Sequence, residues 1–170
     1  MRDELFCYYV ELGHKLNYYR AYSISARRIK NAYSGFLMLV SAAGIATLSC
    51  WDRLPVLWSV VALSAQVLQV LQPLTQSAKQ KEALKYIIQD TSNIFDDVRK
   101  LWDSCGAYGL PAKRDFYKEL AKFRRREDDV IERFASDLDF PHKKRLEKKA
   151  KVNNGDYFRY HYNADIVEEW

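Results

Sequence analysis

The sequence predicts an all-α membrane protein, in which a two-helix transmembrane hairpin carries long helical extensions on its cytoplasmic side. The stretches 31–51 and 54–78 predict the hairpin, because they hold 21 and 25 consecutive residues without Asp, Glu, Lys or Arg in a chain that is 29% charged. A helix needs about 20 apolar residues to cross the roughly 30 Å of bilayer hydrocarbon. Only Asp52 and Arg53 separate the two stretches, so we expect the chain to cross, turn and cross back. Apolar residues at helical spacing predict the extensions.

A pair of buried core helices in a soluble bundle is the alternative interpretation of the two stretches. The mean hydropathy of −0.40 favours it, although the polar remainder of the chain dilutes that average. A core helix of this length would normally carry charges on its solvent face. A cleaved signal peptide fits less well, because the first uncharged stretch begins only at Asn31.

The flanking charges predict the orientation of the hairpin. The connecting turn has one cation, Arg53, which Asp52 offsets. The outer flanks are basic, with Arg20, Arg27, Arg28 and Lys30 before the first stretch and Lys79, Lys81 and Lys85 after the second. Positive charge marks the cytoplasmic side, so we expect both termini in the cytoplasm. The lack of a targeting segment fits a multi-pass protein of the bacterial inner membrane.

Four regions follow from this pattern. They are an N-terminal cytoplasmic amphipathic helix (1–30), the hairpin (31–78, with spans at about 32–50 and 56–74), a cytoplasmic helix (79–105), and a C-terminal cytoplasmic region (111–170) that is helical, basic and aromatic. No proline interrupts the first helix, so we expect it to continue directly into the first span.

Local signals divide the C-terminal half. Gly106 and Gly109 are predicted to stop one helix and Pro111 to begin the next, over about 113–138. A basic run at 143–151 follows, and then an Asn-Asn-Gly sequence that predicts a turn at 153–155. Alternating residues in 156–170 indicate a short strand.

The composition indicates neither an enzyme nor a metal or cofactor site. Three cysteines without CxxC spacing predict no disulfide framework and no zinc site. Three histidines lie far apart in the sequence, without a partner at ligand spacing. The sequence also lacks a glycine-rich phosphate loop, a nucleophile elbow and paired carboxylates in an apolar setting.

Each predicted span has a distinct face. On the first, small residues form a narrow stripe that lets helices pack closely: Gly35, Ala42, Ala46 and Ser49. On the second, polar residues line up as candidates for lining a pore: Ser59, Gln66 and Gln69. Glutamine in hydrocarbon needs a partner helix or water, so these residues either hold an oligomer together or line a wet path, and one ring can do both. Two helices cannot enclose a pore, so we expect a symmetric homo-oligomer and favour a tetramer.

This layout resembles the SLATT domain, a two-transmembrane effector module of bacterial anti-phage systems. The similarity covers roughly residues 5–105 and rests on layout more than on invariant letters. The similarity is carried by Tyr18-Tyr19-Arg20-Ala21, Arg27, Arg28, Tyr33-Ser34, the Ser-Ala-Ala-Gly core at 41–44, Ala78, Lys79, Ala83, Leu84 and Tyr86. The resemblance implies a pore-forming, membrane-depolarising effector controlled by a nucleotide that a partner nucleotidyltransferase makes. The segment after Pro111 departs from the minimal domain.

Cationic groups in that later segment are candidates for binding a nucleotide or oligonucleotide signal. Rings of Arg and Lys in an oligomer would suit phosphates, and Tyr157, Phe158, Tyr160 and Tyr162 could stack on bases. The candidate cations are Arg124, Arg125, Arg126, Lys143, Lys144, Arg145, Lys148 and Lys149. Basic residues near a membrane also bind anionic lipid, and Lys-rich runs often form solvated surfaces.

Two other classes stay open at this point. A phage holin also makes holes from two-span hairpins, although it rarely has so large a cytoplasmic part. A membrane anchor that recruits a soluble partner would need no polar stripe in its spans. Gene neighbours would separate these classes, since a nucleotidyltransferase favours the effector and an endolysin favours the holin.

Overall fold

In the computed structural model, all regular secondary structure of the described residues is helical. The described residues are 1–46, 60, 63–64, 66–67, 78–109, 111–134 and 142–163. Four helices are defined in them: α1 (Arg2–Ala46), α3 (Ala78–Tyr108), α4 (Lys113–Phe134) and α5 (Lys144–Tyr162). This confirms the predicted all-α class for the described residues. The chain divides into two compact units, one of Met1–Ser23 with Lys79–Trp170 and one of Ile24–Ala78.

In the first unit, α3 and α4 pack against the N-terminal half of α1 in opposite directions. Helix α4 runs parallel to α1, because Tyr117 near its start donates a hydrogen bond to Glu4 and Glu127 further along accepts one from Lys15. Helix α3 runs antiparallel to α1, because Trp102 near its end contacts Phe6 at the start of α1.

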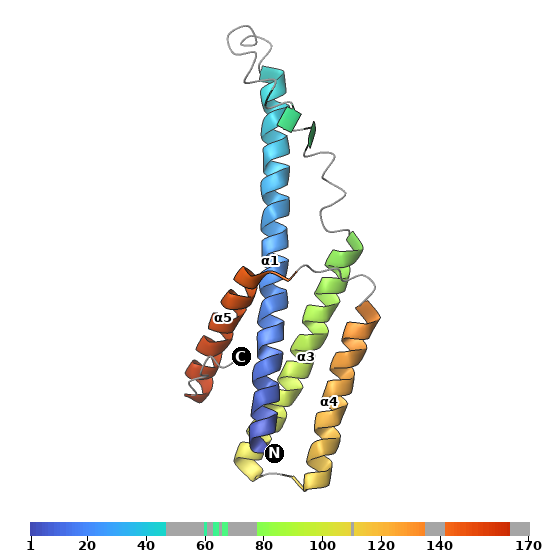
Figure 1. Cartoon of the computed structure of the whole chain (residues 1–170), viewed down its shortest axis with the longest axis vertical. Helices are drawn as coiled ribbons and strands as arrows, with labels where there is room; N and C mark the ends of the chain where they lie inside the picture. The colour runs from blue at the N-terminus through green and yellow to red at the C-terminus, as the bar shows by residue number, and fades with distance from the viewer. Residues whose placement is uncertain are drawn as a thin grey trace. The chain divides into compact units, whose positions relative to one another are not determined.

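Helix α5 completes a four-helix bundle and also runs antiparallel to α1. Lys143, just before α5, lies over the ring of Tyr22, whereas Phe158 near its end contacts Phe6. Helices α4 and α5 flank α1 and α3 on opposite sides (Figure 1).

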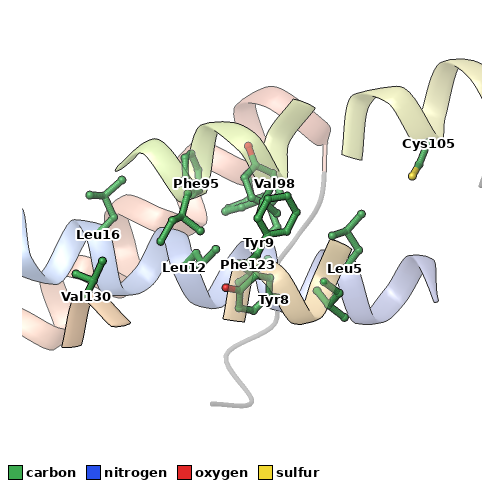
Figure 2. Close-up of a cluster of buried hydrophobic side chains, with 14 of the residues drawn as sticks. Leu5, Tyr8, Tyr9, Leu12, Leu16, Phe95, Val98, Cys105, Phe123 and Val130 are labelled. Carbon is green, nitrogen blue, oxygen red and sulfur yellow. The ribbon is translucent and has the colours of Figure 1, made fainter. Parts of the chain in front are cut away.

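The bundle core is built from residues spaced three or four apart along α1. Leu5, Tyr9 and Leu12 are fully buried and Leu16 is nearly so, as their helical spacing predicts. Figure 2 shows these side chains turned toward residues of α3 and α4, including Val98. Other fully buried members of the bundle are Ala150, Phe116 and Phe158. All four helices of this unit therefore contribute to one hydrophobic core.

The second unit contains the C-terminal part of α1. This helix continues without interruption from the bundle to Ala46, which confirms the expectation that the N-terminal helix runs on into the first uncharged stretch. In the second predicted span, the described residues are helical, and the Ser64 hydroxyl donates to the Val60 carbonyl oxygen at 2.7 Å.

Within the described residues, no helix combines the length and the apolar character needed to cross a bilayer. The predicted spans, 32–50 and 56–74, extend into residues 47–59, 61–62, 65 and 68–77, which lie outside the described part of the chain. The transmembrane hairpin therefore stays a prediction.

The predicted turn at 153–155 and the predicted strand after it were wrong. Both lie in α5, which is helical from Lys144 to Tyr162. Asn154 and Phe158, four residues apart, are buried on the same helix face, and this tertiary burial overrides the local preference for a turn. Asn163 caps the C-terminus of α5: it has the left-handed φ of 50° and donates its N–H to the Arg159 carbonyl oxygen. Residues 164–170 lie outside the described part.

The predicted break between α3 and α4 is confirmed at Gly109 and wrong at Gly106. Helix α3 passes through Gly106 and ends at Tyr108. Gly109 follows with a φ of +86°, a conformation that glycine adopts without steric cost. Helix α4 then begins at Lys113, two residues after Pro111. Its predicted end near 138 lies outside the described residues.

Candidate functional site

A buried carboxylate joins α4 to α1. The face of α4 that enters the core is apolar except for Glu127, which is only 9% exposed. Glu127 accepts hydrogen bonds from the Tyr8 hydroxyl at 3.1 Å and from the Lys15 ammonium at 2.6 Å. Without Glu127 the buried Tyr8 hydroxyl would lose its acceptor, and an unsatisfied buried donor is costly. Glu127 therefore holds α4 against one position along α1.

The charges around Glu127 are balanced within the bundle. Lys15 also pairs with Glu11 at 2.7 Å. Burial alone would lower the pKa of Lys15, but its hydrogen bonds to Glu11 and Glu127 outweigh burial and raise it. Burial and then the neighbouring Glu127 carboxylate raise the pKa of Tyr8, so this hydroxyl stays protonated and donates. The cluster is suited to fixing a helix rather than to acid–base chemistry.

The three consecutive arginines of α4 lie in three different environments. The Arg124 guanidinium lies 5.7 Å from the centre of the Tyr8 ring. Arg125 is exposed. Arg126 pairs with Asp97 of α3 at 2.8 Å, and this bond lowers the pKa of Asp97. Consecutive helical residues point about 100° apart, so the three predicted phosphate ligands do not form one cluster, and Arg126 has a structural partner.

The cations of α5 are more uniform. Lys143, immediately before the helix, is half-buried: its N–H donates to the Tyr18 hydroxyl at 3.2 Å, and its ammonium lies 5.0 Å from the centre of the Tyr22 ring. The remaining predicted ligands on this helix are all exposed: Lys144, Arg145, Lys148 and Lys149. These four residues are called the basic face of α5 below.

The structure does not bring the arginines of α4 and the basic face of α5 together within one chain. Arg124 lies beside Tyr8 and Lys143 beside Tyr22, which are fourteen residues, or about 21 Å, apart along α1. The two helices also lie on opposite sides of α1 and α3 (Figure 1). One small ligand cannot contact both groups in a single chain.

The aromatic residues of the C-terminal segment are mostly core residues. Phe158 is fully buried, so the prediction that it stacks on bases was wrong. The hydroxyls of Tyr157 and Tyr162 lie 3.1 and 3.4 Å from the Tyr9 hydroxyl, and both rings are half-buried. Tyr160 is different, with 85% of its surface exposed, and is the one residue of this group in position to contact a base freely.

A close contact between α1 and α5 was not predicted from the sequence. The amide nitrogen of Asn154 donates to the Val10 carbonyl oxygen at 3.0 Å, and its oxygen has no hydrogen-bond partner among the described atoms. That oxygen lies against Gly13, at a point where a Cβ atom would collide with it. A glycine within a helical pattern was the available signal, because such a residue usually has a packing reason.

The residues predicted to line a pore or pack helices belong to the second unit. Gly35 is exposed, with no atom within 4 Å of the place where a Cβ would lie, and Gln66 is an exposed helical residue. Ala42 and Ala46 lie in α1, but their side chains are outside the described part. Ser49, Ser59 and Gln69 are outside it altogether.

The described residues contain no group of three or more His, Cys, Asp or Glu that could hold a metal ion. Comparisons of the chain with protein-family models, with curated proteins and with solved structures found no match.

Proposed function

We propose that this protein is an effector of bacterial anti-phage defence: an oligomeric channel or pore that depolarises the inner membrane under the control of a nucleotide or oligonucleotide signal. The uncharged stretches and their basic flanks support the membrane assignment. The resemblance to SLATT-type effectors supports the defence role and a partner nucleotidyltransferase as the source of the signal. The proposal needs no catalytic residue and no cofactor.

The observation that carries the proposal is the continuity of α1. Its 45 residues correspond to about 68 Å of helix, more than twice the hydrocarbon thickness of a bilayer. The same helix supplies core residues of the bundle, such as Leu12, and then enters the uncharged stretch at Asn31. One helix therefore contributes both to the hydrophobic core of the bundle and to the uncharged stretch of the proposed first span.

In the proposed oligomer the two span faces have separate roles. The small residues of the first span, Gly35, Ala42, Ala46 and Ser49, let helices approach each other. Ser59, Gln66 and Gln69 on the second span face the ion path. A ring of amide side chains offers both donors and acceptors to water and ions, and this suits a moderately polar pore.

A signal can gate such a channel only if it binds one state of the bundle better than the other. Arg124 and Arg125, two exposed arginines of α4, are the proposed receptor, because guanidinium groups recognise phosphate. Arg124 is well placed for coupling, since it lies over Tyr8, which is hydrogen bonded to Glu127. A phosphate that draws Arg124 away would act next to the contact that fixes α4.

The pore is tested with purified protein in liposomes that report potassium flux. Gln66→Leu should abolish the flux, since it removes a polar group from the proposed path while the protein stays in the membrane. Gln72→Leu is the matched control, because it makes the same change in the same span at a position about 120° from Gln66 around a helix. The control should conduct normally.

Equal flux in the two variants would contradict the pore and favour the membrane anchor. The holin alternative predicts holes that also release a large dye trapped in the liposomes. The proposed ion channel should retain such a dye while it conducts potassium.

A further inference from the structure

The N-terminal half of α5 carries a concentrated positive charge. Residues 143–151 contain six Lys and Arg residues and one carboxylate, Glu147. Glu147 already contacts His142 at 3.2 Å and Lys151 at 3.9 Å. The basic face of α5 therefore projects charge that this carboxylate does not neutralise.

The fold of α5 does not account for this charge. Lys143 occupies the N-cap position without a capping side-chain hydrogen bond, and the amide groups at the N-terminus of a helix already carry partial positive charge. Cations in the first turns of a helix disfavour it for this reason. An external anion would relieve the repulsion.

The exposed cations form an extended strip. Lys144 and Lys148 are four residues apart, as are Arg145 and Lys149, and residues at this spacing are neighbours along one helix surface. The result is two adjacent rows on an exposed surface rather than a set of groups that converge on one point. Such a strip matches a surface that presents many phosphates better than it matches one compact nucleotide.

The basic face also lies at a defined end of the bundle. Lys143 and His142 contact Tyr22 and Tyr18 of α1 through ring interactions, so the first turns of α5 lie at the end where α1 leaves the bundle. Along α1, the uncharged stretch begins at Asn31, nine residues after Tyr22. The opposite end of α5, near Phe158, packs against the start of α1.

We propose that the basic face of α5 docks on the phosphate headgroups of the anionic cytoplasmic leaflet. This inference rests on the proposed membrane function and assigns different partners to the two cationic groups, the bilayer to α5 and the nucleotide signal to Arg124 and Arg125. Long lysine and arginine side chains extend their charged ends well beyond the helix that carries them, toward headgroups. Each cation near an anionic surface strengthens binding about fivefold.

The test measures acetylation of lysine side chains by mass spectrometry on the full-length protein in liposomes. Lys144, Lys148 and Lys149 should be labelled at least about fivefold more slowly in phosphatidylglycerol-containing liposomes than in pure phosphatidylcholine. High salt should remove this protection, because it screens the charges. Lys118 and Lys122, which are exposed on α4, serve as internal controls and should react equally in both lipids.

A charge-reversal pair gives the matched comparison. Arg145→Glu with Lys148→Glu should abolish the protection of Lys144 and Lys149. The same reversal on α4, Lys113→Glu with Lys118→Glu, should leave that protection unchanged. New carboxylates near the N-terminus of α5 favour the helix, so loss of protection in the first variant would not come from unfolding, and circular dichroism checks this.

Three outcomes separate the inference from its rivals. Equal labelling in the two lipids would overturn it. Protection in phosphatidylcholine liposomes that appears only when a short single-stranded DNA is added would also overturn it, because the basic face would then belong to a free polyphosphate. Extraction with alkaline carbonate tests the membrane hairpin separately: a chain that is extracted but still shows lipid-dependent protection refutes the proposed function and retains the docking surface.

Discussion

Replacing Gly13 with alanine should loosen α5 from the bundle, although alanine is the better helix former. A Cβ at this position would collide with the Asn154 side-chain oxygen and would lie 3.1 and 3.3 Å from ring carbons of Phe95 and Phe158. The two rings belong to the core, so they have little room to move. Asn154 would have to give way, and with it the hydrogen bond to the Val10 carbonyl oxygen.

The expected loss of stability in Gly13→Ala is the balance of opposing free-energy effects. Alanine gains about 1 kcal/mol over glycine in a helix interior. Crowding a packed core costs about 1–3 kcal/mol, and depriving the buried Asn154 amide of its hydrogen bond to the Val10 carbonyl oxygen costs about 1–3 kcal/mol more. The net destabilisation should be about 3 kcal/mol, which corresponds to a roughly 150-fold increase in the opening of α5.

Hydrogen exchange of the α5 amides in the full-length protein measures this opening directly. Gly155→Ala is the matched control, because Gly155 also lies within a helix but no atom lies within 4 Å of its Cβ position. This variant should slow exchange about fivefold, the gain expected from helix propensity alone. If Gly13→Ala also slowed exchange, the close contact between α1 and α5 would be refuted.

Three further predictions concern charge. Glu127→Ala should lower the free energy of unfolding by about 1–3 kcal/mol, seen as a lower urea midpoint, because the buried Tyr8 hydroxyl loses its acceptor, while Lys15 keeps its ion pair with Glu11. An unchanged midpoint would contradict the role of Glu127. Burial and then Lys151 lower the pKa of His14 below its usual 6.5, so the stability that neutral His14 contributes is present above pH 6.5 and is lost as the pH falls through its folded pKa. His14→Gln should therefore reduce the fall of the melting temperature with decreasing pH, and an unchanged pH dependence would contradict this role of His14. Arg124→Glu with Arg125→Glu should uncouple the channel from its signal without preventing assembly, with constitutive toxicity if the signal closes the pore and loss of defence if the signal opens it. A normal response of the variant to the signal would show that these two arginines do not bind it.

The helical part of the fold is predictable where the sequence pattern is local. The core positions Leu5, Tyr9 and Leu12 follow from helical spacing, and the uninterrupted α1 follows from the absence of proline. The helix stop at Gly109 follows from its preference for positive φ, which the structure confirms. In these cases the deciding interactions lie within a few residues.

The errors come from contacts between distant parts of the chain. Residues 153–155 favour a turn locally, but burial of Asn154 against Gly13 keeps them helical, and the two residues are 141 positions apart. Likewise Arg126 has a partner in Asp97 on another helix, so a run of three arginines in the sequence does not make one site. A cluster that looks continuous in a sequence is divided by the helical rotation between neighbours.

Thiol labelling in intact bacteria tests the proposed membrane hairpin. Single cysteines are placed at Asp52 and at Lys148 in a chain from which Cys7, Cys50 and Cys105 have been removed, and cells are treated with a reagent that cannot cross the membrane. The proposed topology predicts that the cysteine at position 52 is labelled from outside and that the cysteine at 148 reacts only after the cells are opened. Labelling at position 148 in intact cells, or protection of both positions, would contradict it.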